Sequence, residues 1–175
     1  MTIRLRYVCT SILALACSVP GHGSDTVFSE TLQQVLPKAG YVFLGRVTDV
    51  RYLPPRNSAE LGTVRVTFNV EQGIRGTRTG TTFSIREWSG LWNSGERYRT
   101  GERLVLFLYP PSRVGLTSTV AGPNGRFRVD RSGYVIVPGP ISPIAAPGRP
   151  STRTHVPVRE FTREIRRAAV VERER

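Results

Sequence analysis

The residues with the most potential for chemistry lie between positions 86 and 109, where aromatic and arginine side chains alternate. Aromatic rings stack on bases or sugars and guanidinium groups add positive charge, so such a cluster could bind a strand or a glycan. Trp and Tyr also occur at half-buried edges, where they only cover a core, and we favour that structural interpretation. The candidate ligand face consists of Arg86, Trp88, Trp92, Arg97, Tyr98, Arg99 and Arg103.

A second group of basic side chains lies on a predicted C-terminal helix, residues 157–175. Pro157 suits a first helical turn. We expect the apolar stripe of this helix to dock on the rest of the fold, and the alternative is a free amphipathic helix that meets a membrane or a partner. The stripe consists of Val158, Phe161, Ile165, Ala168 and Ala169. The candidate contacts for a polyanion are Arg159, Arg163, Arg166 and Arg167.

The sequence offers little for catalysis or metal binding. Apart from the predicted leader it contains one histidine, His155, and no spacing connects this residue to a serine and a carboxylate. No Cys/His/Asp/Glu cluster has metal-ligand spacing, and the glycine-rich stretch 115–125 lacks the GK[ST] ending of a phosphate-binding loop. Glu87 and Glu102 could form a carboxylate pair, but among 13 acidic residues such pairs arise by chance. We therefore predict that the protein is not an enzyme and uses no cofactor or metal.

The net charge is strongly positive, with 25 Lys and Arg against 13 Asp and Glu, which gives +12. All the basic residues except Lys38 are arginines, which is typical of GC-rich coding. Because they are spread along the chain, we favour a solvated positive surface, and the alternative is attraction to polyanions by the summed field. For an exported protein these would be anionic glycans, lipid headgroups or acidic proteins; no nucleic-acid partner is expected.

Residues 1–23 have the pattern of a signal peptide. Arg4 and Arg6 precede the apolar stretch 7–19, which is too short to span a bilayer, and small residues precede a cut before Ser24. We therefore predict export, to the periplasm or the medium.

A second cleavage site would change the anchoring of the protein. Ala14-Leu15-Ala16-Cys17 resembles a lipoprotein box, in which Cys17 would carry the lipid. The alternative localisation is thus a membrane-anchored lipoprotein, and membrane contact is expected only with a lipid on Cys17. Both cysteines, Cys9 and Cys17, precede Ser24, so a domain cut at Ser24 would rely on its core without disulfides.

The middle of the chain is predicted to be mainly β. Strict alternation of apolar and polar residues over 64–71 is the clearest strand pattern. Gly45 interrupts the first strand, residues 41–50, and indicates a bulge or bend. Residues 104–109 are apolar at every position, which predicts a central strand that lies between a barrel interior and a helix. A short helix is expected before the first strand and a Pro-rich linker over residues 139–156.

Three stretches carry a family resemblance: residues 42–47, 64–76 and 101–108. They resemble the core of tissue-inhibitor-of-metalloproteinase-like and netrin-module-like barrels, and more closely that of exported bacterial proteins of unknown function with this core. The resemblance implies a mainly β domain over residues 24–138, a small closed or partly open OB-like β-barrel of five or six strands. The short N-terminal helix and the C-terminal amphipathic helix flank it.

The resemblance does not extend to zinc chelation. Metalloproteinase inhibitors of this fold chelate the catalytic zinc through a mature N-terminal cysteine, and cleavage before Ser24 supplies none, whereas Cys17 would be acylated. The resemblance therefore predicts the fold but not the function, which depends on the residues of a particular site. We expect a non-enzymatic exported binding module for a protein or a cell-surface polymer. The alternatives are a polyanion-binding module, with a glycan or lipid headgroup as ligand and the Arg-rich surface and helix as contact, and a protease inhibitor.

Overall fold

The computed structural model describes residues 32–55, 57, 60–94, 97–137 and 154–173. The predicted signal peptide, Cys17 and most of the predicted linker lie outside these residues.

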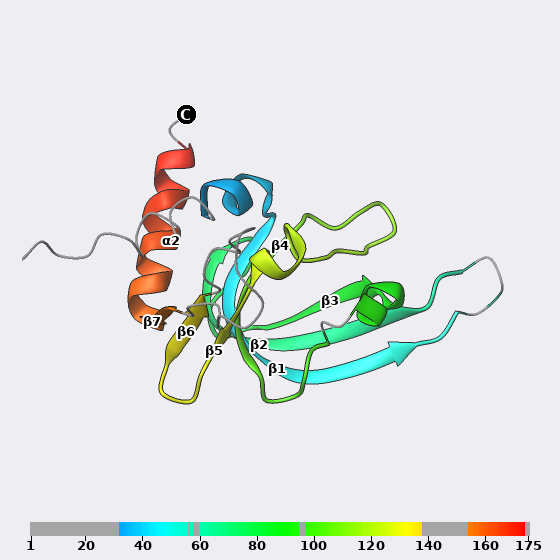
Figure 1. Ribbon diagram of the computed structural model, residues 1–175. Coiled ribbons are helices and arrows are strands. Elements are labelled where there is room, and N and C mark those ends of the chain that lie inside the picture. The colour runs from blue at the N-terminus through cyan, green and yellow to red at the C-terminus, as the bar shows by residue number, and fades with distance from the viewer. Residues whose placement is uncertain (1–31, 56, 58–59, 95–96, 138–153, 174–175) are drawn as a thin grey trace, which may run out of the picture.

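Seven antiparallel strands form one sheet in the order β3-β2-β1-β4-β5-β6-β7 (Figure 1). The mainly β class and the two flanking helices are therefore confirmed. The strands are β1 (Tyr41–Leu53), β2 (Thr63–Arg75), β3 (Thr82–Trp88), β4 (Arg103–Leu108), β5 (Arg126–Val129), β6 (Tyr134–Val137) and β7 (Thr154–Pro157). The helices are α2 (Val158–Arg173), the 3-10 turns η1 (Leu36–Lys38), η2 (Ser89–Ser94) and η3 (Gly122–Gly125), and a helical stretch at residues 32–35.

The predicted closed or partly open barrel of five or six strands is not confirmed. The sheet has seven strands, and no strand pairing among the described residues joins its end strands β3 and β7. The extra strand β7 falls in the segment that the sequence pattern assigns to the linker and the start of the helix. β7 is too short to show alternation, and its pairing with β6, with Val156 opposite Val135, depends on a distant segment. Pro157 is tolerated there because β7 is an edge strand.

β1 contains a bulge at Gly45, as the sequence predicts. The register between β1 and β2 shifts at Leu44/Gly45. A Cβ at Gly45 would lie 3.0 Å from the Phe43 ring and 3.1 Å from the Asn69 carbonyl oxygen. A bulge increases the local twist of a strand, and β1 pairs with β2 along its length and with β4 through Tyr41–Arg46.

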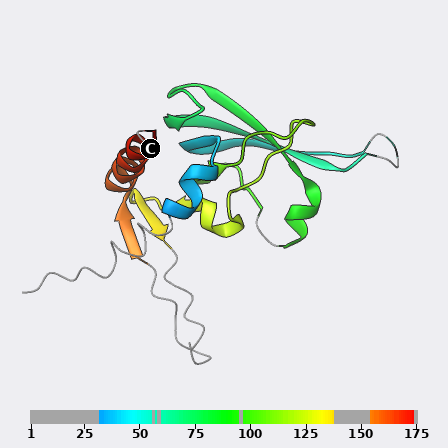
Figure 2. The ribbon, with the colours of Figure 1, turned by 90° about the horizontal axis from the view of Figure 1, so that it is seen from above.

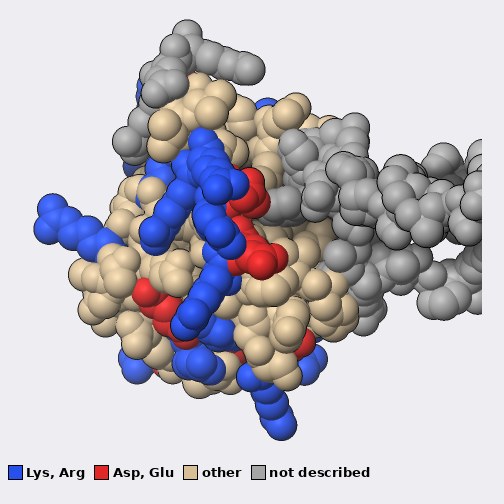
Figure 3. All heavy atoms as spheres, turned by 90° about the vertical axis from the view of Figure 1, so that its left-hand side faces the viewer, with Lys and Arg blue, Asp and Glu red and all other residues tan. Residues whose placement is uncertain are grey.

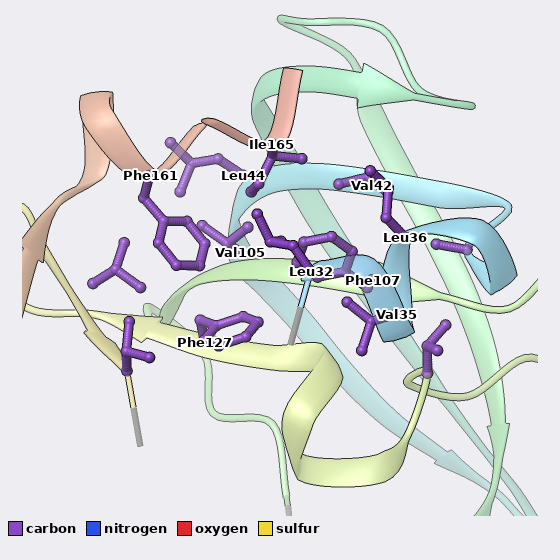
Figure 4. Packing of buried hydrophobic residues seen from close by; sticks show 14 of the residues in the cluster. Leu32, Val35, Leu36, Val42, Leu44, Val105, Phe107, Phe127, Phe161 and Ile165 are labelled. Atoms are coloured by element: carbon purple, nitrogen blue, oxygen red, sulfur yellow. The ribbon is translucent and has the colours of Figure 1, made fainter. Parts of the chain in front are cut away.

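Two hydrophobic cores lie on opposite faces of β1 and β4. Side chains alternate along β4, so that Val105 and Phe107 enter one core and Leu104, Leu106 and Leu108 the other, as predicted for a strand covered on both faces. The helix-side core includes Leu32, Val35, Leu36, Val42, Leu44, Val105, Phe107, Phe127, Phe161 and Ile165 (Figure 4). The sheet-side core includes Phe43, Val47, Val64, Val66, Phe68, Val70, Ile85, Tyr98, Leu104, Leu106 and Leu108.

The C-terminal helix is docked, which confirms the favoured interpretation of its apolar stripe. Phe161 and Ile165 are completely buried in the helix-side core. Arg75 of β2 also holds the helix: it donates hydrogen bonds to the carbonyl oxygens of Leu36 (2.8 Å) and Ala39 (3.2 Å) and forms an ion pair with Glu172 of α2. Figure 2 shows α2 at one end of the molecule and the distal halves of β1 and β2 extending away from it.

Candidate functional site

The four arginines predicted on the C-terminal helix line one groove of about 500 Å³. They come from the exposed side of α2, and Gln72 of β2 lies across from them. Figure 3 shows basic side chains gathered in a column on this end of the molecule. The groove is lined by Gln72, Arg159, Thr162, Arg163, Arg166, Arg167 and Val170.

The spacing of these arginines follows from the docking of α2. Phe161 and Ile165 fix which side of the helix faces the core, and Arg159 and Arg163 are then one turn apart on the outer side. With a rise of 1.5 Å per residue, charges four positions apart are separated by about 6 Å along the axis. The helix therefore presents a row of positive charges.

Most of these charges are not neutralised by a neighbouring carboxylate. Arg167 forms an ion pair with Glu164 at 2.8 Å. In the described part of the chain, Arg159, Arg163 and Arg166 have no acidic side chain within salt-bridge distance. A planar guanidinium group offers two parallel N–H donors that match carboxylate, sulfate or phosphate oxygens. The groove is thus suited to hold an anion with several negative charges.

The predicted aromatic ligand face is only partly assembled. Trp88, Trp92 and Arg97 line a second pocket of about 480 Å³, the aromatic pocket, together with Val50, Tyr52, Val64, Ser89 and Gly90. The four other predicted residues do not line it. Tyr98 is buried in the sheet-side core, Arg86 and Arg99 are exposed elsewhere, and Arg103 forms an ion pair with Glu71 at 2.6 Å.

A buried carboxyl group lies next to this pocket. Glu87 follows Phe83 and Ile85 on the inward side of β3 and is 5% exposed. The Tyr98 hydroxyl donates to its Oε1 atom (3.0 Å), and the Trp92 indole nitrogen donates to its Oε2 atom (3.4 Å). Burial raises the pKa of Glu87, and the hydrogen bonds from Tyr98 and Trp92 and the charge of Arg126 oppose this only in part.

Arg126 connects Glu87 to Glu102, the other carboxylate considered in the sequence analysis as a partner of Glu87. Its guanidinium group lies 4.3 Å from the centre of the Tyr98 ring and donates to Glu102 (2.8 Å) and to the carbonyl oxygen of Arg97 (3.0 Å). Glu87 and Glu102 are therefore joined through Tyr98 and Arg126. This network holds Trp92, Tyr98 and Arg97 in place under the aromatic pocket.

We predict that the Glu87→Gln variant gains stability relative to the wild type as the pH rises. The folded wild type holds the Glu87 proton more tightly than the unfolded chain, so this group lowers stability as the pH rises from the ordinary Glu value of 4.5 through the raised pKa. Each pH unit between the two pKa values corresponds to about 1.4 kcal/mol. Urea unfolding of both proteins from pH 4.5 to neutrality measures the difference. A difference that stays constant with pH would contradict the burial of an ionisable Glu87.

Several lining residues were not predicted from the sequence. Gln72 joins the groove only because β2 passes beside α2, and Tyr52 joins the aromatic pocket only because β1 is long enough to reach η2. The burial of Glu87 could have been predicted from the sequence, since it lies on the same face of β3 as the apolar residues Phe83 and Ile85. A charged residue at an inward position of a strand is a sign of a buried polar network.

The remaining candidates for chemistry are dispersed. His155 is exposed on β7, with its Nδ1 atom 3.6 Å from Asp130. In the described ranges no group of three or more His, Cys, Asp or Glu side chains comes together. None of the helices described has the length and apolar composition to cross a bilayer.

Comparison with known protein families, with curated proteins and with solved structures finds no match to this chain.

Proposed function

We propose that this protein is a non-enzymatic exported binding module and that it binds a linear polyanion in the groove along α2. The observation that supports this most is that Arg159, Arg163, Arg166 and Arg167 line one groove, and that only Arg167 has a carboxylate partner among the described residues. Close cations repel one another, and a bound anion with several charges would relieve that repulsion.

The docking of α2 strengthens the proposal. A free amphipathic helix would have to order itself on binding, which weakens affinity. Here Phe161 and Ile165 are completely buried, and the Arg75–Glu172 ion pair secures the C-terminal end of the helix. The row of charges is therefore pre-organised before a ligand arrives, so little ordering entropy is lost on binding.

We also propose that the strands β1 to β4 form a partly open OB-like barrel. Three features support this architecture. β1 has a register shift at Gly45 and pairs with both β2 and β4. The loop after β4 pairs back through Thr119 opposite Leu108, and the amide of Thr117 donates to the Arg86 carbonyl oxygen of β3 at 2.8 Å. Amide hydrogen exchange in deuterated buffer tests whether the loop after β4 closes onto β3. We expect the Thr117 amide to be protected, and its rapid exchange would contradict the closure.

The test of function compares two variants with the same net charge. The groove variant replaces Arg159, Arg163, Arg166 and Arg167 with Gln. The control variant replaces four exposed arginines elsewhere that have no ion pair among the described residues, Arg65, Arg78, Arg113 and Arg131. Titration with a heparin tetrasaccharide should show the groove variant weakened by about tenfold or more, which is about 1.4 kcal/mol, and the control weakened far less.

Equal weakening of both variants would overturn the proposal, because it would mean that only the overall charge matters. The source of the anion is distinguished by a second titration with vesicles that contain phosphatidylglycerol. If the groove variant loses vesicle binding but keeps heparin binding, a lipid headgroup is the ligand, and the reverse result identifies a glycan.

A further inference from the structure

The aromatic pocket is built where three strand ends meet η2. Tyr52 of β1 lies opposite Val64 of β2, and Trp88 of β3 lies opposite Thr63. Trp92 of η2 and Arg97 complete the pocket. It shares no lining residue with the arginine groove, and the ends of β1, β2 and β3 that build it lie away from α2 in Figure 1 and Figure 2.

The aromatic side chains in this pocket are held in place yet remain open to solvent. A Cβ at Gly90 would lie 2.3 Å from the Trp88 ring, so the indole packs directly over the glycine backbone. The Trp92 ring is fixed by its hydrogen bond to the buried Glu87. Nevertheless Trp88 is 43% and Tyr52 60% exposed. Rigid, exposed aromatic faces are suited to stacking, because binding then orders few side chains.

Polar groups with unused hydrogen-bonding capacity surround these rings. Among the described residues, the Tyr52 hydroxyl, the Trp88 indole nitrogen and the Arg97 guanidinium group have no hydrogen-bond partner. An apolar side chain of another protein in this pocket would bury these polar groups without giving them hydrogen bonds, which is unfavourable. A ligand that combines an apolar face with a hydroxylated rim would satisfy both the rings and the donors.

We infer that the aromatic pocket binds one pyranose unit of an acidic glycan. The C–H face of a pyranose ring stacks on Trp88 or Tyr52, its hydroxyl groups meet the unused donors, and a carboxylate on the sugar pairs with Arg97. The cavity of about 480 Å³ falls within the range of small-molecule sites, about 300–1,000 Å³. This site does not depend on the polyanion groove, because none of its residues lies on α2.

Tryptophan fluorescence tests this inference directly, because the chain has two tryptophans and both line the pocket. Titration with tetragalacturonic acid should give a saturable change in emission, and its methyl ester, the same sugar without carboxylate charges, should bind about fivefold or more weakly. Trp88→Ala should weaken binding of the acidic sugar about tenfold or more, with Trp92 as the remaining reporter. The matched control is Tyr134→Ala, an exposed aromatic residue on β6.

Arg97→Gln provides a second variant that leaves both tryptophans and the core intact. It should abolish the preference for the acidic over the neutral sugar, and the groove variant of α2 should show the same change in tryptophan emission as the wild type with both sugars, because both tryptophans lie in the aromatic pocket. Absence of a saturable change with either sugar overturns the inference. A change that N-acetylleucinamide produces and the sugars do not also overturns it, since that result identifies an apolar protein side chain as the occupant.

Discussion

The Phe161→Ala variant is expected to lose about 3–5 kcal/mol of unfolding free energy. The Phe161 ring is completely buried in the helix-side core, where its centre lies 5.0 Å from that of Phe127. Removing it leaves a cavity between α2 and the sheet, because β4 and β5 beneath it are held by strand pairing and cannot collapse into the space. Urea unfolding followed by circular dichroism measures the loss.

The matched control for this prediction is Val170→Ala on the same helix. Val170 is 56% exposed, so its truncation should change the unfolding free energy by no more than about 0.5 kcal/mol. A loss of less than about 1 kcal/mol for Phe161→Ala would mean that α2 is not part of the packed core. The pre-organised row of arginines would then lack its support.

The Arg126→Met variant is expected to lose about 3–5 kcal/mol, because it leaves a carboxylate without its buried partner. The Arg126 side chain is 4% exposed and forms an ion pair with Glu102 at 2.8 Å. The same guanidinium group lies over the Tyr98 ring and favours the ionised form of Glu87. Methionine retains much of the volume, so the loss reports mainly the charge and its hydrogen bonds.

Arg128 supplies a matched control at the same carboxylate. Its side chain also pairs with Glu102, at 2.9 Å, but is 58% exposed. Ion pairs in contact with water contribute about 0–1 kcal/mol, so Arg128→Met should be nearly neutral. Chemical denaturation of both variants at neutral pH makes the comparison, and similar losses for both would contradict the difference in burial between the two arginines.

The sequence predicted those features that depend on local periodicity. The apolar residues at every position of 104–109 indicated a strand covered on both faces, and the structure places alternate side chains of β4, which ends at Leu108, in two cores. The stripe that contains Phe161 and Ile165 predicted the docking of the helix. Because the helical period that places Phe161 in the core also places Arg159 and Arg163 outside, the composition of the groove wall could be predicted as well.

Features that depend on contacts between distant segments were not predicted. β7 pairs with β6 across a long intervening segment, and its four residues are too few to show alternation. The aromatic pocket needs Tyr52 beside Trp88, a neighbourhood that the register of β1, β2 and β3 creates. Arg103 was grouped with the aromatic residues by its position in the sequence, but it begins β4 and its side chain is turned to Glu71.

A map of amide chemical shifts shows whether the arginines of α2 form the polyanion site. Titration of the isotope-labelled protein with a heparin tetrasaccharide should shift the amides of Arg159, Arg163, Arg166 and Arg167, and of Gln72 across the groove. Amides near exposed arginines elsewhere, such as Arg65 and Arg113, should move little. Shifts of similar size at these control positions, or none along α2, would contradict a polyanion site on this helix.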